Sequence, residues 1–536
     1  MNRLLLAVLG AALFCTSAFA QATPSGGSCE KLGQLALSNA KVTSAGVVAA
    51  GGFVVPANPG QRPSTDPIYK TLPEFCRVMI TATPSADSDV KIEVWLPLSG
   101  WNGRMQGEGN GGFAGEISYH GLAESVLQGY AAVATDTGHA GSAVDARWAL
   151  GHPEKITDFG YRAIHVMTEV GKATTKSFLG NAPQHSYFAA CSNGGRQALL
   201  EAQRYPEDYD GIIAGAPANY WSHLLSSAIF DAQATTVDAA SYIPAAKVPA
   251  IGQAVNAACD AQDGVSDGIL NDPRKCHFDP ATLLCKEGDS AKCLTAPQVT
   301  ALKKLYQGGR DSHGKQIFPG RLPGGEEGEG GWGLWITGPA QGKALLFYFG
   351  SGFFVNMVYG KADWDYKTAN IDEVVKAAEG MSGTFDATNA DLSAFQARGG
   401  KLIIDHGWDD AAISALNSIA YFRGVGGAMG EAKRDAFLRL YMVPGMQHCA
   451  GGPGADFFGQ FGPSPLKDAQ HSVQVALEQW VEKGIAPGTI VATHFPDDDP
   501  AKAPTMTRPL CPFPQVAKYK GSGDTNAAEN FVCAAP

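Results

Sequence analysis

The sequence has few charged residues and no excess of positive charge. It contains 41 Lys and Arg against 52 Asp and Glu in 536 residues, which gives a formal net charge of −11. An acidic protein repels nucleic-acid phosphates, so we expect no nucleic-acid partner. The sequence after residue 20 has no apolar run long enough for a membrane helix, so we expect no membrane partner. Small molecules remain as ligands, and the oligomeric state is left open.

The first twenty residues have the organisation of an export signal. Arg3 gives the positive start, residues 4–14 are apolar, and Ala18 and Ala20 supply small residues at a cleavage site. A lipoprotein signal centred on Cys15 is disfavoured by the bulky Phe14 before it. We therefore predict a signal peptide at residues 1–20 and a secreted or periplasmic protein.

The sequence also lacks the paired C-x₂-C ligand sets of a zinc site. It has 11 cysteines, and ten remain when Cys15 of the signal segment is set aside. An even number in an exported protein predicts five disulfides, and several free buried thiols are the alternative. The ten are Cys29, Cys76, Cys191, Cys259, Cys276, Cys285, Cys293, Cys449, Cys511 and Cys533.

A regular alternation of strands and helices is missing only from the middle of the chain, about residues 223–385. Outside it, apolar runs predict strands at 91–96, 130–135, 186–190, 211–214, 401–404 and 437–443. Helical spacing is found at 161–178, 196–204, 414–422 and 468–481. The alternation implies a mostly parallel sheet covered on both faces. We predict a catalytic domain of residues 21–222 and 386–536, interrupted by a lid domain of residues 223–385.

Ser192 lies where the strand at 186–190 turns into the helix at 196–204, within the sequence Ala-Cys-Ser-Asn-Gly-Gly. Such a turn exposes the hydroxyl and directs the amides of the helix N-terminus at a reacting carbonyl. Ala190 replaces the first glycine of G-x-S-x-G and is small enough for the turn. The motif alone is common, but its position between a strand and a helix predicts a nucleophile in an α/β-hydrolase fold with a large inserted lid domain.

A serine nucleophile needs a base, and in this fold the acid and then the histidine follow it on loops after later strands. His448 follows the strand at 437–443, and Asp409 and Asp410 follow the strand at 401–404. We predict a triad of Ser192, His448 and Asp410, with Asp409 as the alternative acid.

Two cysteines provide an independent test of this triad. Cys191 precedes Ser192 and Cys449 follows His448, so a hydrogen bond between serine and histidine would bring both cysteines near disulfide distance. Closing so long a loop contributes roughly 4–5 kcal/mol in the chain-entropy model.

Cys191-Ser192, Asp410 and His448-Cys449 together resemble the linked triad of the tannase and feruloyl esterase family, which includes mono(2-hydroxyethyl) terephthalate hydrolases. Residues 107–115, 130–139 and 406–410 look like further family segments. The resemblance covers nearly the whole mature chain. It implies a catalytic domain of the α/β-hydrolase fold, an inserted lid and hydrolysis of aromatic esters. It also suggests the remaining disulfides, Cys29–Cys76, Cys259–Cys276, Cys285–Cys293 and Cys511–Cys533.

A serine esterase also needs backbone amides directed at the oxyanion of the tetrahedral intermediate. The amide of Asn193 is the first candidate, and Gly111 or Gly112 of the glycine-rich loop is the second. The alternative for this loop is a plain tight turn.

Asp260, Asp263 and Asp267 form an oxygen-rich loop that is typical of a Ca²⁺ site, although its spacing is not that of an EF-hand. By themselves they fit solvated turn carboxylates equally well. The family resemblance favours Ca²⁺ and adds the carbonyls of Val265 and Ile269. We expect a structural ion and no organic cofactor.

The lid segment is rich in aromatic residues that could hold an aromatic ring or simply form the core of the lid. The candidate substrate-binding residues are Trp335, Phe353, Phe354 and Ile413. The aromatic stretch at 332–359 contains no Arg to bind a terephthalate carboxylate.

We therefore expect hydrolysis of a hydroxycinnamic or gallic acid ester. A terephthalate monoester is the alternative within the family. A non-catalytic exported binding protein and a hydrolase that uses calcium in its chemistry are the alternatives of other classes.

Overall fold

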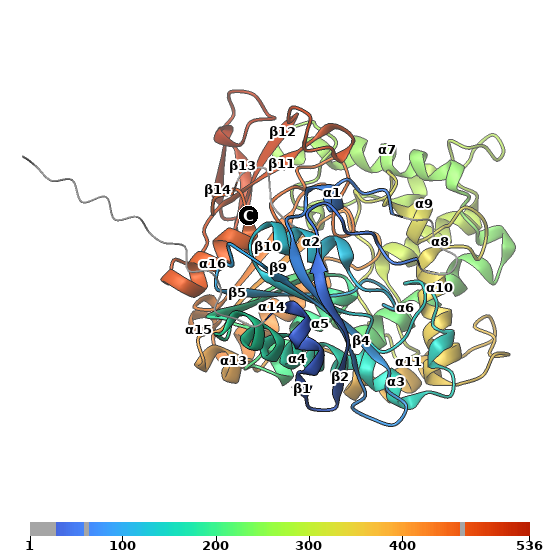
Figure 1. Ribbon diagram of the computed structural model, residues 1–536. Coiled ribbons are helices and arrows are strands. Elements are labelled where there is room, and N and C mark those ends of the chain that lie inside the picture. Colours follow the sequence, from blue (N-terminus) through green and yellow to red (C-terminus); the bar gives the residue numbers. More distant parts are fainter. Residues whose placement is uncertain (1–27, 58–63, 461–466) are drawn as a thin grey trace, which may run out of the picture.

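The computed structural model of the protein describes residues 28–57, 64–460 and 467–536 (Figure 1). The predicted signal peptide lies outside the described residues. A ten-stranded mixed sheet, ordered β1-β2-β3-β4-β6-β5-β7-β8-β9-β10, forms the centre. Its strands are β1 (Ala36–Leu37), β2 (Ala40–Val48), β3 (Phe75–Ala82), β4 (Val90–Pro97), β5 (Arg104–Glu108), β6 (Ala131–Thr135), β7 (His185–Cys191), β8 (Gly211–Gly215), β9 (Lys401–Gly407) and β10 (Leu438–Val443).

The parallel pairing that was predicted for most of the sheet is found from β6 to β10, whereas the predicted strand at 91–96 is the antiparallel β4. From β6 to β10 all neighbours pair in parallel, whereas β1 to β4 pair antiparallel and β4 pairs antiparallel with β6. Two small antiparallel sheets follow near the C-terminus, formed by β11 (Ile490–His494) with β12 (Met506–Leu510) and by β13 (Val516–Tyr519) with β14 (Phe531–Ala534).

Successive residues of the central strands face two different cores. Ile212 of β8 packs in the core that contains residues of α4, α5 and α14, while Ile213 packs with α16. Ile404 and Ile403 of β9 are separated in the same way. Because side chains alternate between the faces of a strand, a sheet covered on both faces needs nearly continuous apolar runs. These runs are the signal from which the central strands were predicted.

The helices cover both faces of the sheet, and α6 to α13 lie in the segment between β8 and β9. They are α1 (Ile68–Thr71), α2 (Tyr119–Leu127), α3 (Pro153–Thr157), α4 (Ala163–Leu179), α5 (Asn193–Arg204), α6 (Trp221–Thr236), α7 (Val248–Cys259), α8 (Ala296–Gln307), α9 (Trp332–Trp335), α10 (Leu345–Phe353), α11 (Ile371–Glu379), α12 (Ser382–Phe385), α13 (Ser393–Ala397), α14 (Leu416–Met429), α15 (Glu431–Asp435) and α16 (Val473–Lys483).

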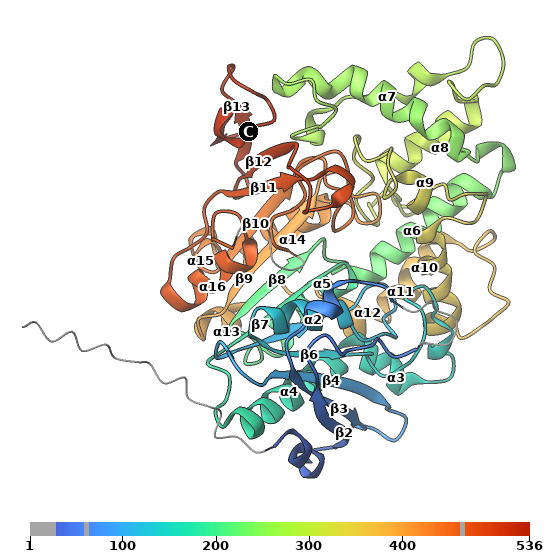
Figure 2. The same ribbon diagram turned by 45° about the horizontal axis from the view of Figure 1, so that its top comes forward.

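Residues 216–400 separate β8 from β9, although these two strands are neighbours in the sheet. This segment adds no strand to the large sheet, and Figure 2 shows α6 to α10 gathered to one side of the sheet. The sequence of this segment shows no clear alternation of strands and helices. Most of α6 is buried, so this helix lacks the polar face that makes a helical period visible in a sequence.

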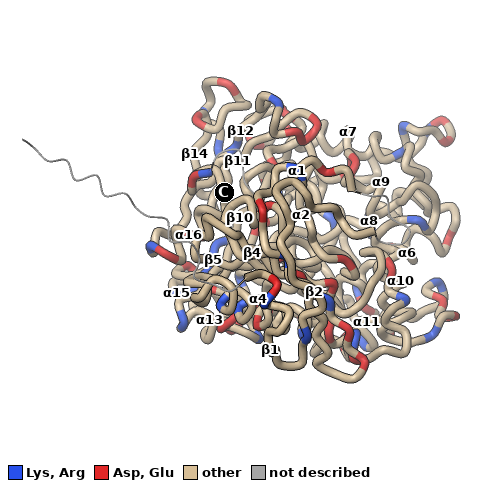
Figure 3. Tube along the Cα trace, viewed as in Figure 1, with Lys and Arg blue, Asp and Glu red and all other residues tan. Residues whose placement is uncertain are grey.

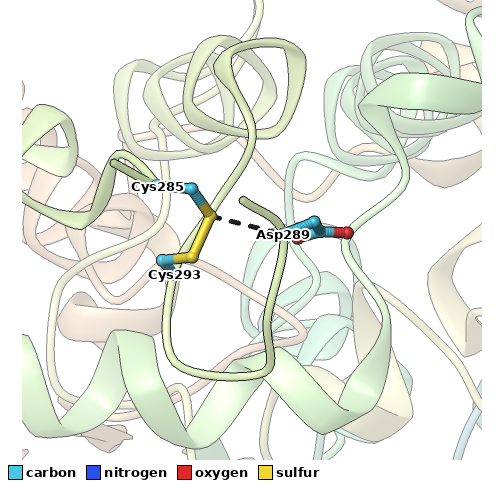
Figure 4. A group of neighbouring side chains, drawn as sticks. All are labelled: Cys285, Asp289 and Cys293. Carbon is cyan, nitrogen blue, oxygen red and sulfur yellow. Dashed lines mark hydrogen bonds between the residues drawn. A yellow bond between two sulfur atoms is a disulfide. The ribbon is translucent and has the colours of Figure 1, made fainter. Parts of the chain in front are cut away.

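All five predicted disulfides are present, so the alternative of several free thiols is wrong. They are Cys29–Cys76, Cys191–Cys449, Cys259–Cys276, Cys285–Cys293 and Cys511–Cys533. Asp289 lies beside the Cys285–Cys293 bond, so three residues of types that can bind a metal are close together in this loop (Figure 4). Thiolates bind metals, and both sulfur atoms here are already used in the disulfide. This group is therefore a covalent loop closure.

Acidic and basic residues are interspersed along the chain, as Figure 3 shows. Among the described residues, no helix combines the length and the apolar character that crossing a bilayer requires.

Candidate active site

Ser192 occupies a strained turn between β7 and α5. Its backbone has φ 65° and ψ −123°, which non-glycine residues rarely adopt. Glycine is needed at position 194, because a Cβ there would lie 2.4 Å from the Cβ of Ala190. The Ser192 amide donates to Gly215 O at 2.9 Å and fixes the turn to the next strand. The turn therefore holds Ser192 at the carboxyl end of β7 and the N-terminus of α5, as the motif predicts.

His448 and Asp410 lie in hydrogen-bonding sequence with Ser192. His448 Nε2 is 2.9 Å from Ser192 Oγ, and His448 Nδ1 is 2.8 Å from Asp410 Oδ2. Asp410 follows β9 and His448 follows β10, and these strands are parallel neighbours whose carboxyl ends meet at one edge. When Nδ1–H donates to the carboxylate, Nε2 is free to accept the serine proton.

The carboxyl of Asp410 is held in its ionised form. Burial alone would raise the pKa of Asp410, but the charge of His448 and hydrogen bonds from His406 and His448 lower this pKa below its usual value. Its Oδ1 also accepts the amides of Ala412 and Ile413, both at 2.8 Å. An ionised carboxylate is the state that can orient His448.

Asp409 lies in a different environment. It is 2% exposed, and burial together with the charge of Glu326 raises the pKa of Asp409 to about 8. Its carboxyl is therefore protonated at neutral pH. In the described part of the chain, Asp409 makes no hydrogen bond to His448, whose Nδ1 contacts Asp410 instead. The geometry favours Asp410 over Asp409 as the partner of His448.

A cavity of about 520 Å³ opens beside Ser192 and His448. Its volume is typical of small-molecule sites, which are roughly 300–1,000 Å³. Trp335, Leu345 and Phe349 of the inserted segment form an apolar wall of the cavity. The ring of Trp335 lies 5.0 Å from that of His448, edge to face. Ser192 and His448 thus face a cavity large enough for a small molecule.

Comparison with known proteins identifies the family. A family model described as tannase and feruloyl esterase matches residues 76–534. The chain belongs to the tannase and feruloyl esterase family. It is a carboxylic ester hydrolase with the α/β-hydrolase fold, as the sequence analysis predicted.

Individual relatives agree with this assignment. The esterase is 41% identical over 556 residues to an uncharacterized esterase of Xanthomonas campestris, which covers 98% of this chain and 93% of the relative. It is 35% identical over 539 residues to a mono(2-hydroxyethyl) terephthalate hydrolase of Piscinibacter sakaiensis, covering 87% and 85%. The crystal structure of feruloyl esterase B from Aspergillus oryzae matches with a TM-score of 0.85 and 29% identity, covering 94% and 99%.

The predicted oxyanion donors of the esterase lie at the cavity or next to Ser192. Gly111 and Gly112 line the cavity, and Asn193 begins α5. In the described part of the chain, the amides of these three residues donate to no other group. Glycine is needed at 112, where a Cβ would lie 2.3 Å from Ala143 O at φ 53°. The three amides are therefore free to bind an oxyanion, and this role stays a prediction.

Three of the four predicted substrate-binding residues do not line the cavity of the esterase. Trp335 does, but Phe353 and Phe354 are fully buried in a core shared with Trp221. A lid core and a binding wall look alike in the sequence, because both are aromatic. Ile413 is also buried, and its backbone serves the acid: its amide donates to Asp410, and its carbonyl accepts from His406.

His406 is a positioning residue that the sequence analysis did not identify. Its Nε2 lies 3.1 Å from Asp410 Oδ2, and its Nδ1 lies 2.7 Å from Ser418 Oγ. The only signal in the sequence is its position four residues before Asp410. Such a spacing predicts proximity in a helix, but here β9 ends and a loop follows, so the contact needed the structure.

The predicted calcium loop of the esterase contains an oxygen-only set of groups. Asp260 Oδ1 accepts the amides of Asp267 and Gly268 at 3.2 and 2.9 Å, which folds the loop back on itself. Burial and the charges of Asp267 and Asp260 raise the pKa of Asp263. A bound cation would relieve this repulsion, and carboxylates with carbonyls are the donors that Ca²⁺ prefers.

The two carbonyls predicted to complete this set are also available. Those of Val265 and Ile269 accept no hydrogen bond from a described residue. Arg508 Nη2 donates to Asp267 Oδ2 at 2.7 Å, so one carboxylate already has a cationic partner. Carboxylates and carbonyls are the donors of a hard cation, and a structural ion at this loop stays a prediction.

Proposed function

We propose that the protein is an exported serine esterase that hydrolyses esters of aromatic acids, hydroxycinnamic or gallic, through an acyl-enzyme on Ser192. The observation that carries the proposal is the pair of short contacts from His448, 2.9 Å to Ser192 Oγ and 2.8 Å to Asp410 Oδ2. Family membership supplies the reaction class.

The first half-reaction forms the acyl-enzyme. His448 Nε2 takes the hydroxyl proton as Ser192 Oγ attacks the ester carbonyl carbon. The amides of Asn193 and of Gly111 or Gly112 stabilise the resulting oxyanion, a contribution of about 10²–10³ in rate per donor. The carbonyl then re-forms, the carbon–oxygen bond to the alcohol breaks, and His448 gives its proton to the leaving alkoxide.

The second half-reaction releases the acid. His448 takes a proton from water, the hydroxide oxygen bonds to the acyl carbon, and the bond to Ser192 Oγ breaks as the proton returns to the serine. Asp410 keeps the imidazole in one tautomer and stabilises its charged form in both steps.

The lining of the cavity supports an aromatic and neutral substrate. Trp335 and Phe349 supply ring faces, and no Lys or Arg is found among the described lining residues. A terephthalate monoester carries a carboxylate and ranks second. It is kept because a relative named mono(2-hydroxyethyl) terephthalate hydrolase is 35% identical.

Export, the lid and calcium belong to the same proposal. Five disulfides fit an oxidising compartment outside the cytosol, which agrees with the signal-like first twenty residues. Residues 223–385 act as a lid that contributes Trp335 to the cavity. The groups of Asp260, Asp263, Val265, Asp267 and Ile269 hold a structural Ca²⁺, and the reaction needs no organic cofactor because Ser192 supplies the nucleophile.

The test is hydrolysis by the purified protein of methyl ferulate, methyl gallate, chlorogenate and mono(2-hydroxyethyl) terephthalate. Ser192→Ala is the inactive control, and Ser522→Ala, at an exposed serine, is the matched control. We expect turnover of at least one of the first three, lost in Ser192→Ala and kept in Ser522→Ala. Preference for the terephthalate ester would establish the second candidate. Absence of any turnover would favour a binding protein.

A further inference from the structure

The cavity beside Ser192 extends into a polar arm that the triad does not use. The polar arm is lined by residues of β5, α2 and α16 and by the residue before β6, and its polar groups are Gln106, Glu108, Ser125, Tyr130 and Gln474. None of these five residues was assigned a role in the site from the sequence. The apolar wall formed by Trp335, Leu345 and Phe349 has a different chemistry, so the cavity offers both polar and apolar groups to a substrate.

Glu108, the last residue of β5, has one oxygen available to a ligand. Its Oε1 accepts from Ser125 Oγ at 2.7 Å, while its Oε2 accepts from no described residue. Glycine is needed at position 121, because a Cβ there would lie 2.7 Å from Oε2. Burial raises the pKa of Glu108 to about 7. Near neutral pH this carboxyl can therefore donate as well as accept a hydrogen bond.

Gln474 also has unused hydrogen-bonding capacity. Its Nε2 makes only long contacts, 3.5 Å to Gln106 Oε1 and 3.4 Å to both Tyr130 Oη and Glu478 Oε1. Well-formed N–H···O bonds are about 2.7–3.2 Å. Its Oε1 accepts from no described residue. Polar groups placed at a cavity with weak partners can exchange those partners for the hydroxyls of a ligand.

The cations beside the polar arm are already paired. Arg104 contacts Glu478 at 2.8 Å and Glu482 at 2.7 Å. His120 lies 2.6 Å from Asp66 and 3.2 Å from Glu124, and hydrogen bonding to Glu124 raises its pKa to about 9.

A ligand carboxylate in the polar arm would therefore meet the carboxyls of Glu108 and Glu124 without a free cation to bind it. Bringing like charges together in a poorly solvated site is unfavourable. The polar arm is thus suited to an uncharged group with several hydroxyls, each of which can donate and accept.

We propose that the polar arm is a subsite for a neutral, hydroxyl-rich part of the substrate ester, bound by Glu108 and Gln474. The inference rests on the proposed esterase activity and adds a determinant of substrate choice to it. Sites built to hydrogen-bond a substrate hydroxyl discriminate strongly against analogues that lack it, because buried polar groups are then left unpaired. The hydroxyls belong either to a polyol in the alcohol part or to the ring of a phenolic acid.

Two substrate pairs distinguish these sources. Cinnamoyl glucose against methyl cinnamate varies the alcohol part, and methyl gallate against methyl benzoate varies the ring. The kcat/KM ratio within each pair is measured for the wild type, Glu108→Leu, Gln474→Leu and the conservative Glu108→Gln. Glu287→Leu, at an exposed glutamate of the lid segment, is the matched control. Active-site titration with a fluorophosphonate normalises each preparation for folded enzyme.

We expect the wild type to favour the hydroxylated member of one pair by about tenfold or more. Glu108→Leu and Gln474→Leu should each lower that kcat/KM ratio at least about fivefold, mainly through KM. Glu108→Gln should retain more of the ratio than Glu108→Leu, and Glu287→Leu should leave the ratio unchanged. Loss in the cinnamate pair assigns a polyol to the polar arm, and loss in the gallate pair assigns the phenolic ring. If the ratios of both pairs are the same in every variant, the subsite is refuted while the proposed function stands. If the wild type cleaves none of the four esters but hydrolyses methyl ferulate or chlorogenate, the subsite alone is refuted; if it hydrolyses no ester at all, both proposals fall.

Discussion

Cys191 and Cys449 form a disulfide that joins the residue before Ser192 to the residue after His448. The two cysteines are 258 positions apart in the sequence, and their Cα atoms are 6.0 Å apart in the structure. The bond ties the end of β7 to the loop after β10, next to the contact between the Ser192 hydroxyl and the His448 imidazole. Its position makes it a part of the site as well as of the fold.

Removal of this disulfide should reduce activity and stability together. For Cys191→Ser with Cys449→Ser we expect the free energy of unfolding to fall by about 2–5 kcal/mol and kcat to fall, because the two loops lose their covalent link. The matched control is Cys285→Ser with Cys293→Ser, which opens a loop with a sequence separation of only 8. Denaturant unfolding measures the free energy of unfolding of each variant, and ester hydrolysis measures its kcat. An unchanged kcat in the first variant would show that the bond does not hold the triad in register.

Asp409 and Asp410 provide a matched pair of neighbouring carboxyls. Asp410→Asn should lower kcat by about 10³–10⁴, because the amide cannot hold the charged imidazole in its productive tautomer. Asp409→Asn should keep nearly full activity, since the Asp409 carboxyl is already protonated at neutral pH. The measurement is kcat for a methyl ester at neutral pH. Equal losses in the two variants would contradict the assignment of the acid.

The same aspartate should make stability depend on pH. Burial raises the folded-state pKa of Asp409 to about 8, above its ordinary value of 3.8. The folded protein therefore holds a proton that the unfolded chain releases between these values, and this group lowers stability as pH rises through that window. The free energy of unfolding of Asp409→Asn, relative to that of the wild type, should be higher at pH 8 than at pH 5 by about 1–3 kcal/mol. Urea unfolding of both proteins at pH 5 and pH 8 measures this. If the variant and the wild type differ by the same free energy at both pH values, the prediction is refuted.

Calcium removal should affect the fold and leave the chemistry intact. Chelation by EDTA should lower Tm by several degrees, because ion binding to the folded state alone adds to stability. At a temperature well below unfolding, kcat should remain, since the reacting groups do not include the ion. Asp263→Asn should show a lower Tm and no further response to EDTA. A loss of turnover at unchanged Tm would instead support metal chemistry.

Much of the catalytic domain could be predicted because its central strands are buried on both faces. The apolar runs at 401–404 and 437–443 correspond to β9 and β10. Because the acid and the base follow these strands, the runs indicated Asp410 and His448. β5 was not predicted, since its sequence Arg-Met-Gln-Gly-Glu carries polar residues that line the cavity. The polar arm was missed with it.

The site residues that could not be predicted are those whose role depends on tertiary contacts. Ser192 and His448 were found because each follows a strand that the sequence reveals. Phe353 was misplaced because an aromatic residue in a core and one at a ligand look alike in a sequence, and only burial distinguishes them. The partnership of His406 with Asp410 depends on how the chain leaves β9, which no local pattern encodes.

The most direct test of the account is fluorophosphonate labelling followed by peptide mass spectrometry. A serine whose hydroxyl is activated by His448 should form one stoichiometric adduct, at Ser192, and hydrolysis should fall in proportion to the adduct. His448→Ala should label far more slowly. An adduct at another residue, or full hydrolysis by the fully labelled protein, would contradict Ser192 as the nucleophile.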